Sequence, residues 1–297
     1  MVIGPLLRLV TSFTTSTASP LPTAPPPAPP YPPILYGTAW KKERTTELVL
    51  LAIEAGFRAI DTACQPKHYD EAAVGVAVER AASFGVPRSE LWLQTKFTPI
   101  SGQDPNRVPY DVHAPIEEQV DQSVATSLAN LKTPYIDCLV LHSPLSEHGE
   151  TMRAWRAMES HVERGHVRHL GISNQYDARD LSRLLADAHV KPLCVQNRFV
   201  AQHGRHDVEV RALCSQHGIR YSSFWTLSGN KQLLQGRAVR DVARAHGCTP
   251  EQAWLGFVRG LGISPLSGTT SEAHMRHDLA LPALSEQEVE RLGYLIG

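Results

Sequence analysis

The sequence predicts an α/β protein built as a single domain, a closed (β/α)8 barrel of parallel strands. From residue 34 onward, short apolar segments alternate with amphipathic segments of helical spacing, which is typical of βα units. Eight such units occupy about 260 residues, or roughly 33 residues each, which is the size of a TIM barrel. The alternative is a doubly wound sheet, which the absence of Gly-x-Gly-x-x-Gly after the first strand disfavours.

The expected elements follow from apolar runs and helical periodicity. We expect strands at 34–36, 57–60, 91–95, 136–141, 167–172, 193–196, 219–224 and 263–266. Helices are expected at 45–55, 70–83, 116–131, 151–163, 207–216, 236–245 and 250–259, and two more after residues 271 and 285. Gly56 is placed to end the first helix, and Ser285 with Glu288 forms a capping box for the last. The polar stretch 97–114 is long for a connector, which indicates a functional loop.

The N-terminal stretch differs from the rest of the chain. Nine of the fourteen residues from 20 to 33 are proline, and no acidic residue precedes Glu43. We expect residues 1–33 to be a disordered, Pro-rich N-terminal tail and residues 34–297 to form the barrel. The tail is acid-free like a transit peptide but has one arginine, so a cytoplasmic location is expected and mitochondrial import is the minor alternative.

Charge and composition narrow the partners. There are 29 Lys and Arg against 30 Asp and Glu without a long basic run, so nothing indicates binding to nucleic acid or an anionic membrane surface. No apolar stretch is long enough to span a membrane. The five cysteines are odd in number and lack CxxC spacing, as expected of a reduced intracellular protein. We therefore expect a monomer that acts on a small molecule.

Polar residues close several of the predicted strands. In a barrel, the carboxyl ends of the strands form one face, and barrel enzymes hold their active sites there. Alone, each residue has an ordinary reading, such as a helix cap for an aspartate or a solvated loop for a lysine. Their joint placement predicts one pocket, formed by Asp61, Lys96, His142, Ser173, Asn174 and Gln196.

A tyrosine beside a lysine and an aspartate has a chemical use. The phenol of Tyr69, with an ordinary pKa near 10, is a poor proton donor at neutral pH. We expect the ammonium of Lys96 to lower this pKa, and Asp61 to keep the lysine charged and oriented. His142 can donate to the same substrate oxygen. Two donors would then stabilise the alkoxide that forms when a hydride reaches a carbonyl carbon.

Five segments, in this order, resemble the signature elements of the aldo-keto reductase superfamily. The resemblance implies an NADP-dependent barrel enzyme, with NAD possible, that reduces aldehyde or ketone carbonyls to alcohols. It implies a catalytic tetrad of Asp61, Tyr69, Lys96 and His142, with Tyr69 as the general acid. The segments are Gly56-Phe57-Arg58-Ala59-Ile60-Asp61-Thr62-Ala63, His68-Tyr69 with Glu71, Val74 and Gly75, Thr95-Lys96, Leu141-His142 and Gly171-Ile172-Ser173-Asn174.

The resemblance also implies where the nicotinamide cofactor binds. The ring that stacks on the nicotinamide would be Phe224, with the neighbouring Trp225 as its rival. Amide and hydroxyl groups suit the carboxamide, and hydroxyls at a helix start suit a phosphate. In chain order, the implied cofactor-binding residues are Gly37, Thr38, Trp40, Ser173, Asn174, Gln196, Ser223, Phe224, Leu227, Ser267, Thr269, His274 and Asp278.

The chain departs from the family pattern at two places. Three extra residues, through Gln65-Pro66-Lys67, separate Asp61 from Tyr69, so the tyrosine needs a local bulge to reach the site. In the segment that holds the 2′-phosphate of NADP, Leu266 stands for the usual lysine and His274 for the usual arginine. Hydroxyls and N–H groups would therefore carry most of the phosphate binding.

Two other functions fit parts of the pattern. A non-catalytic barrel would bind the cofactor and keep the fold without the chemistry. A metal-dependent hydrolase would use Asp61 with Cys64-x-x-x-His68 and Cys138-x-x-x-His142. Barrel metallohydrolases bring histidines from several strand ends, and Cys138 lies inside a predicted strand, so no metal is expected.

Overall fold

Eight parallel strands form a closed barrel in chain order, as predicted. The computed structural model describes residue 1 and residues 30–297, so most of the predicted tail lies outside the described residues. β1 is hydrogen bonded to both β2 and β8, which closes the barrel. The strands are β1 (Leu35–Gly37), β2 (Ala59–Asp61), β3 (Trp92–Phe97), β4 (Ile136–Leu141), β5 (Val167–Ser173), β6 (Cys194–Arg198), β7 (Arg220–Phe224) and β8 (Ile263–Ser267).

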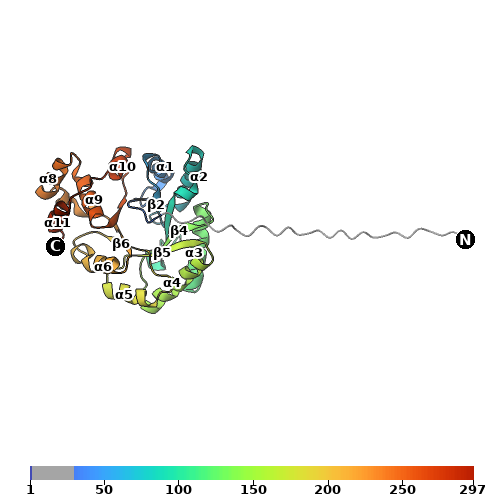
Figure 1. Cartoon of the computed structure of the whole chain (residues 1–297). Coiled ribbons are helices and arrows are strands. Elements are labelled where there is room, and N and C mark those ends of the chain that lie inside the picture. The colour runs from blue at the N-terminus through green and yellow to red at the C-terminus, as the bar shows by residue number, and fades with distance from the viewer. Residues whose placement is uncertain (2–29) are drawn as a thin grey trace.

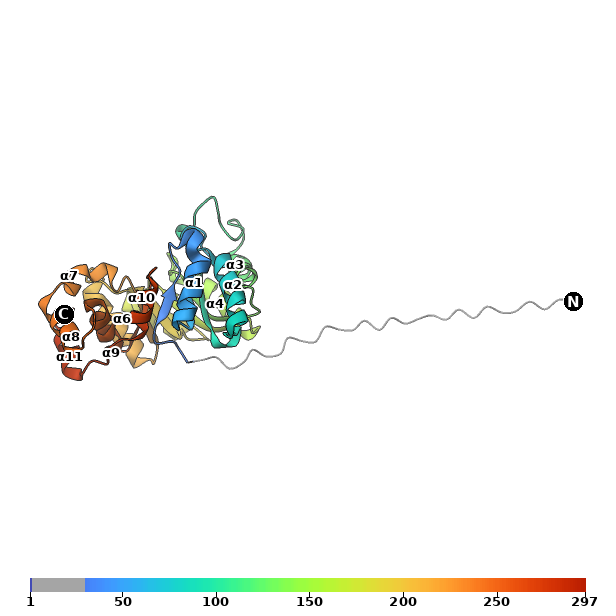
Figure 2. The ribbon, with the colours of Figure 1, turned by 90° about the horizontal axis from the view of Figure 1, so that it is seen from above.

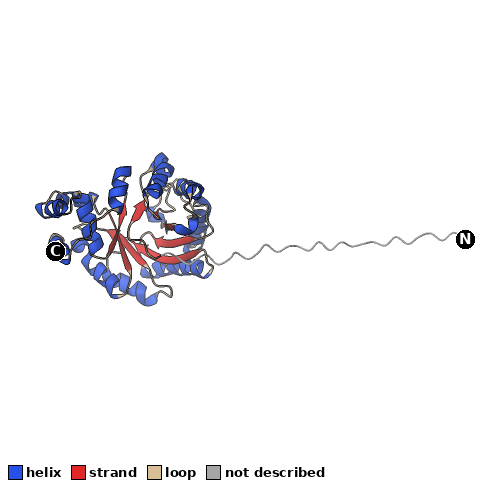
Figure 3. Cartoon of the chain, turned by 45° about the horizontal axis from the view of Figure 1, so that its top comes forward, coloured by secondary structure: helices blue, strands red, loops and turns tan. Residues whose placement is uncertain are grey.

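Helices surround the strands (Figures 1 and 3). They are α1 (Thr45–Ala55), α2 (Glu71–Ala81), α3 (Ile116–Asn130), α4 (His148–Glu163), α5 (Ala178–Asp187), α6 (Gly204–Gln216), α7 (Lys231–Leu234), α8 (Arg237–Ala245), α9 (Pro250–Gly260), α10 (Glu272–Leu279) and α11 (Glu286–Gly293). Short 3-10 helices are η1 (Lys42–Arg44), η2 (Ala82–Phe84), η3 (Arg88–Glu90), η4 (Ile100–Gly102) and η5 (Ser228–Asn230). α1 packs against α2, and α8 against α11, on opposite flanks of the barrel (Figure 2). Among the helices of residues 30–297, none combines the length and apolar character needed to cross a bilayer.

The sequence patterns did not predict α5. Asp177 caps its N-terminus by accepting hydrogen bonds from the backbone N–H groups of Arg179 and Asp180. Its buried residues are Leu181, Leu184 and Leu185, at the spacing of one helical face. The sequence therefore contains a helical pattern here, but only three leucines carry it in a segment that is otherwise rich in charged residues.

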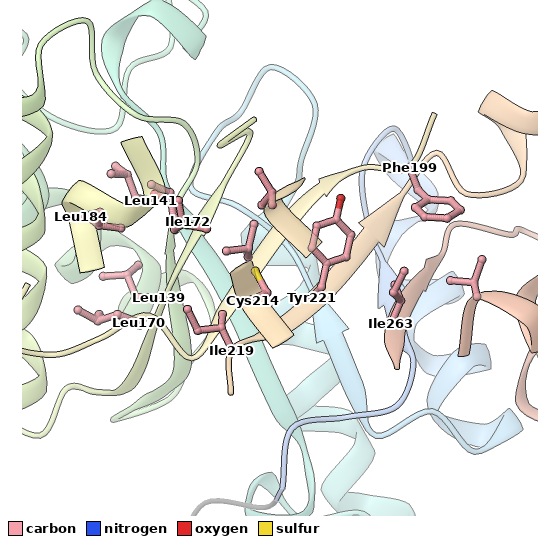
Figure 4. Close-up of a cluster of buried hydrophobic side chains, with 14 of the residues drawn as sticks. Leu139, Leu141, Leu170, Ile172, Leu184, Phe199, Cys214, Ile219, Tyr221 and Ile263 are labelled. Carbon is pink, nitrogen blue, oxygen red and sulfur yellow. The ribbon is translucent and has the colours of Figure 1, made fainter. Parts of the chain in front are cut away.

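The main hydrophobic core lies between the barrel wall and the helices. Along β4 and β5, alternate side chains point outward, and Leu139, Leu141, Leu170 and Ile172 pack near Leu184 of α5 (Figure 4). Successive side chains of a strand point to opposite faces. The residues between these four along each strand therefore point into the barrel. Inward-facing side chains at the carboxyl end of a strand, or just after it, lie at the upper face of the barrel.

Tyr31 closes the floor of the barrel, at the amino ends of the strands. Its ring packs edge-on against Trp92 with 5.3 Å between centroids, and its hydroxyl is hydrogen bonded to Ser222 Oγ. Next to it, Ser264 Oγ donates to the carbonyl of Pro32 at 2.8 Å. Tyr31 and Pro32, which the sequence analysis placed in the tail, thus contact the barrel. Small inward side chains such as Cys194 leave room that the tyrosine fills.

Candidate active site

A cavity of about 900 Å³ opens at the carboxyl ends of the strands. All four predicted catalytic residues, Asp61, Tyr69, Lys96 and His142, line it. So do most of the predicted cofactor residues, namely Gly37, Trp40, Ser173, Asn174, Gln196, Phe224, Leu227, Ser267, Thr269, His274 and Asp278. Side chains separated by more than 200 residues in the chain therefore share one pocket.

Two predicted cofactor residues do not line the cavity. Thr38 is buried in the wall, where its backbone N–H and its hydroxyl both donate to the carbonyl of Asp61 at 3.0 Å. Ser223 is buried too, with its hydroxyl 2.8 Å from that of Thr226. Both residues are part of the cavity wall, because their side-chain hydroxyls form hydrogen bonds with other groups of the protein.

Asp61 and Lys96 form a buried ion pair at the centre of the site. Lys96 Nζ donates to Asp61 Oδ1 at 2.7 Å, to Oδ2 at 2.8 Å and to the carbonyl of Thr62 at 2.7 Å. A buried charge is stable only when it is paired and hydrogen bonded, and both conditions are met here. The pair holds the lysine in one orientation, as the sequence predicted.

Two glutamines also donate to Asp61. Gln94 Nε2 lies 2.8 Å from Asp61 Oδ1, and Gln196 Nε2 lies 3.1 Å from the same oxygen. Gln196 is therefore not a free amide, because one of the two N–H donors of its NH₂ group is used by Asp61. Gln94 was not among the predicted residues. Its position two residues before Lys96, on the same face of β3, was the signal that could have found it.

The three extra residues before Tyr69 form a compact turn. The carbonyl of Gln65 accepts from the N–H groups of His68 and Tyr69 at 3.2 and 3.1 Å, and Gln65 Nε2 donates to the carbonyl of Gly102 at 2.8 Å. The insertion is thus absorbed locally. The ring of Tyr69 still reaches the site, where its centroid lies 5.3 Å from Lys96 Nζ.

The electrostatics of Tyr69 differ from the prediction. Burial, and then the charge of Asp61, raise the pKa of Tyr69 well above its usual value, whereas the sequence predicted a lowering by Lys96. Burial is the larger cause, and Lys96, whose hydrogen bonds go to Asp61 and to the carbonyl of Thr62, does not offset it. The phenol consequently stays protonated at neutral pH, as a proton donor must before it reacts.

His142 is held as a neutral imidazole. Burial lowers its pKa well below the usual range, and the charge of Lys96 lowers it further. Its Nδ1 lies 2.6 Å from Thr98 Oγ1. When the Thr98 hydroxyl donates to Nδ1, the proton is on Nε2, which becomes a donor. Sequence reasoning missed Thr98, although it follows Lys96 by two residues and lines the cavity.

The far end of the cavity lies at the end of β8. Ser267 Oγ donates to Asp278 Oδ2 at 2.6 Å, and the hydroxyl of Tyr36 donates to the carbonyl of Thr269 at 2.9 Å. Lys41 was not predicted. It is buried, lines the cavity and donates from Nζ to the carbonyl of Gly268, and burial lowers its pKa. A cation thus stands beside the segment in which Leu266 and His274 replace basic residues.

Both candidate stacking rings line the cavity. The guanidinium of Arg198 lies 4.5 Å from the ring centroid of Trp225 and 5.9 Å from that of Phe224. Trp225 is 54% exposed and has a left-handed backbone with φ of 57°. Phe224 is more buried than Trp225.

The metal-hydrolase alternative finds no support among residues 30–297. Cys138 points into the barrel, where its sulfur lies 3.8 Å from that of Cys194, and His142 is bonded to Thr98. Within this part of the chain, no group of three or more His, Cys, Asp or Glu side chains is arranged to hold a metal. The polar groups of the site, such as the phenol of Tyr69 and the imidazole of His142, are suited to donating protons and hydrogen bonds.

Known proteins are similar to this chain in sequence and fold. The model of the aldo/keto reductase family matches residues 34–296. An aldo-keto reductase of Mycobacterium avium (strain 104) is 32% identical over 241 residues, which cover 80% of this chain and 76% of the relative. The NAD(P)H-dependent D-xylose reductase of Pachysolen tannophilus is 28% identical over 268 residues, covering 77% of this chain and 79% of the relative.

A solved structure agrees with these sequence matches. The crystal structure of an aldo/keto reductase from Brucella melitensis superposes with a TM-score of 0.75 at 25% identity, covering 89% of this chain and 95% of that one. The chain therefore belongs to the aldo/keto reductase family and is an oxidoreductase that reduces aldehyde or ketone carbonyls to alcohols.

Proposed function

We propose that Tyr69 is the general acid of this reductase and that Asp61, Lys96 and His142 complete its catalytic site. The observation that carries the proposal is their convergence in one cavity, with Tyr69 against a buried Asp61–Lys96 pair. Bound NAD(P)H supplies the hydride that reduces the carbonyl carbon. The protein supplies the proton and stabilises the charge that develops on the carbonyl oxygen.

Each residue has a distinct part in the proposed chemistry. The phenol of Tyr69 hydrogen bonds to the substrate oxygen and gives up its proton as negative charge develops there. An alkoxide is a far stronger base than a phenolate, so this proton transfer is thermodynamically favourable even from a phenol with a raised pKa. Lys96, whose ammonium lies near the ring, stabilises the phenolate that remains. Neutral His142 offers Nε2–H as the second donor.

We infer that the cofactor lies across the same cavity and that NADP is preferred over NAD. The volume of about 900 Å³ and the donor set suit a dinucleotide. Ser173, Asn174 and the free carbonyl of Gln196 would hold the carboxamide, and Phe224 or Trp225 would stack on the ring. At the phosphate end, the hydroxyl of Thr269, His274 and the ammonium of Lys41 would hold the additional phosphate of NADP, and their place on the cavity wall supports this proposal.

The substrate is inferred to be a small carbonyl compound and the protein a cytoplasmic monomer. All five cysteines are free, as expected in a reducing compartment. Polar groups such as Gln65, His68 and Ser143 line the cavity near Tyr69, so a polar aldehyde or ketone is expected to fit.

The test is the Tyr69→Phe variant. We expect it to lower the rate of NADPH-dependent carbonyl reduction by roughly 10²- to 10⁴-fold, because the general acid is lost. NADPH binding, measured by fluorescence titration, should change less than about twofold, since hydride-donor binding uses other residues. Turnover at the wild-type rate would rule out Tyr69 as the acid. Wild-type protein that binds NADPH but reduces no aldehyde or ketone would instead favour the non-catalytic reading.

A further inference from the structure

Gln94 lies directly beneath the catalytic pair. It is fully buried, does not line the cavity, and pairs with Asp61 in the register of β2 and β3. Its Nε2 donates to Asp61 Oδ1 at 2.8 Å, while its Oε1 accepts from the thiol of Cys194 at 3.9 Å. Barrel interiors are mostly filled with branched aliphatic side chains, so a buried glutamine at this position requires a reason.

The chemistry of Asp61 fixes the orientation of this amide. An ionised carboxylate only accepts hydrogen bonds, so Gln94 must turn its NH₂ group toward Asp61. The same oxygen also accepts from Lys96 and Gln196, at 2.7 and 3.1 Å. Asp61 Oδ1 is thus held by three donors from β3 and β6, and the lysine is only one of them.

The three hydrogen bonds to Asp61 Oδ1 change the electrostatic effect of this carboxylate on Tyr69. The charge of Asp61 is one of the two causes that keep the phenol of Tyr69 protonated. Each hydrogen-bond donor places positive partial charge beside an ionised carboxylate and offsets part of its negative field. Each donor on Asp61 therefore weakens the repulsion that a phenolate at Tyr69 meets.

We propose that Gln94 is a positioning residue of the reductase: its amide holds Asp61 and limits how strongly that carboxylate opposes proton release from Tyr69. The inference rests on the proposed role of Tyr69. Gln94 touches neither cofactor nor substrate and acts only through Asp61. The titratable groups that surround this pair of residues and Tyr69 are Tyr31, His68, Lys96, Cys138, His142 and Cys194.

The first experiment compares pH profiles of Gln94→Met and wild type. Methionine fills a similar volume without a donor. We expect kcat to fall about tenfold at every pH at which Tyr69 stays protonated, the loss typical of one hydrogen bond to a charged group. KM and the Kd for NADPH should stay within about twofold.

The second variant, Gln94→Glu, gives a reversible switch. At low pH, the new carboxyl is protonated, donates its O–H to Asp61 and replaces the amide. At higher pH it ionises beside Asp61, and two adjacent carboxylates repel each other. We therefore expect kcat to be near the wild-type value at acidic pH. As pH rises, kcat of the variant should fall at a pH at which kcat of the wild type does not yet fall.

Ser264→Ala is the matched control. Ser264 also lies inside the barrel, but its hydroxyl donates to the carbonyl of Pro32 and does not contact Asp61. It should lower the melting temperature without moving the pH profile. If both Gln94 variants keep the wild-type profile, or lose only stability as the control does, the inference is wrong. A wild-type protein without reductase activity would instead contradict the proposed function, so the two failures are distinguishable.

Discussion

Asp207 is a buried carboxyl outside the active site. It accepts hydrogen bonds from Asn197 Nδ2 at 2.6 Å and from the hydroxyl of Tyr221 at 2.8 Å. Burial raises the pKa of Asp207 to about 6. It also closes a run of three left-handed residues, Arg205 to Asp207, with φ between 53° and 63°. Such a conformation costs free energy, and these hydrogen bonds help to maintain it.

This carboxyl makes stability depend on pH. The pKa of about 6 in the folded protein lies above the ordinary value near 3.9, so folding favours the protonated form. The favourable contribution is complete below about pH 4 and is lost as pH rises through 6. We expect the free energy of unfolding of the wild type to fall, relative to Asp207→Asn, by on the order of 2 kcal/mol between pH 4.5 and 7.5.

Urea denaturation of both proteins at several pH values measures this difference. Glu209→Gln is the control, because Glu209 is exposed on the same helix. An Asp207→Asn curve parallel to that of the wild type over this range would show that Asp207 does not titrate there.

At the scale of elements, two distant segments meet at the end of β8. Lys41, in the segment between β1 and η1, donates to the carbonyl of Gly268, and Tyr36 of β1 donates to that of Thr269. β1 and β8 are adjacent only because the barrel closes. A lysine near the start of the chain therefore lies beside the proposed phosphate site near its end.

Replacing Lys41 by methionine tests this part of the site. We expect the Kd for NADPH to rise about tenfold, because a charge-assisted contact to the additional phosphate is lost. The Kd for NADH should change less than about twofold. Lys42→Met is the matched control, since Lys42 is exposed and does not line this cavity. Equal weakening of both cofactors would mean that Lys41 serves a phosphate common to both.

At the scale of the molecule, the two ends of the barrel differ. Its upper end is the reaction cavity, and its floor is sealed by Tyr31, which contacts β3 through Trp92 and β7 through Ser222. Residues from the start of the described segment thus join strands on different sides of the barrel.

Tyr31→Ala should destabilise the protein by about 2–4 kcal/mol, because it opens a cavity in the floor. Tyr31→Phe removes only the hydroxyl and should cost about 1 kcal/mol. Chemical denaturation measures both values, and cofactor binding at 20 °C should persist in both variants. A Tyr31→Ala protein as stable as the wild type would show that the floor does not depend on this ring.

Much of the fold and site was accessible from the sequence. Strand periodicity predicted the barrel, and polar residues at strand ends predicted the cavity that holds Asp61, Lys96 and His142. Tyr69 lies there too, because the Gln65 turn absorbs the insertion. α5 was accessible but overlooked, since Leu181, Leu184 and Leu185 carry its helical spacing.

The remaining features were decided by tertiary structure. Gln94 on Asp61, Thr98 on His142, Lys41 on Gly268 and Tyr31 on Ser222 join residues between 33 and 227 positions apart. The sequence alone determined which residues face the upper end of the barrel, because alternation along a strand is local. Which partners those residues meet, and the direction in which the pKa of Tyr69 moves, depend on strand register, closure and burial, which exist only once the whole chain is packed.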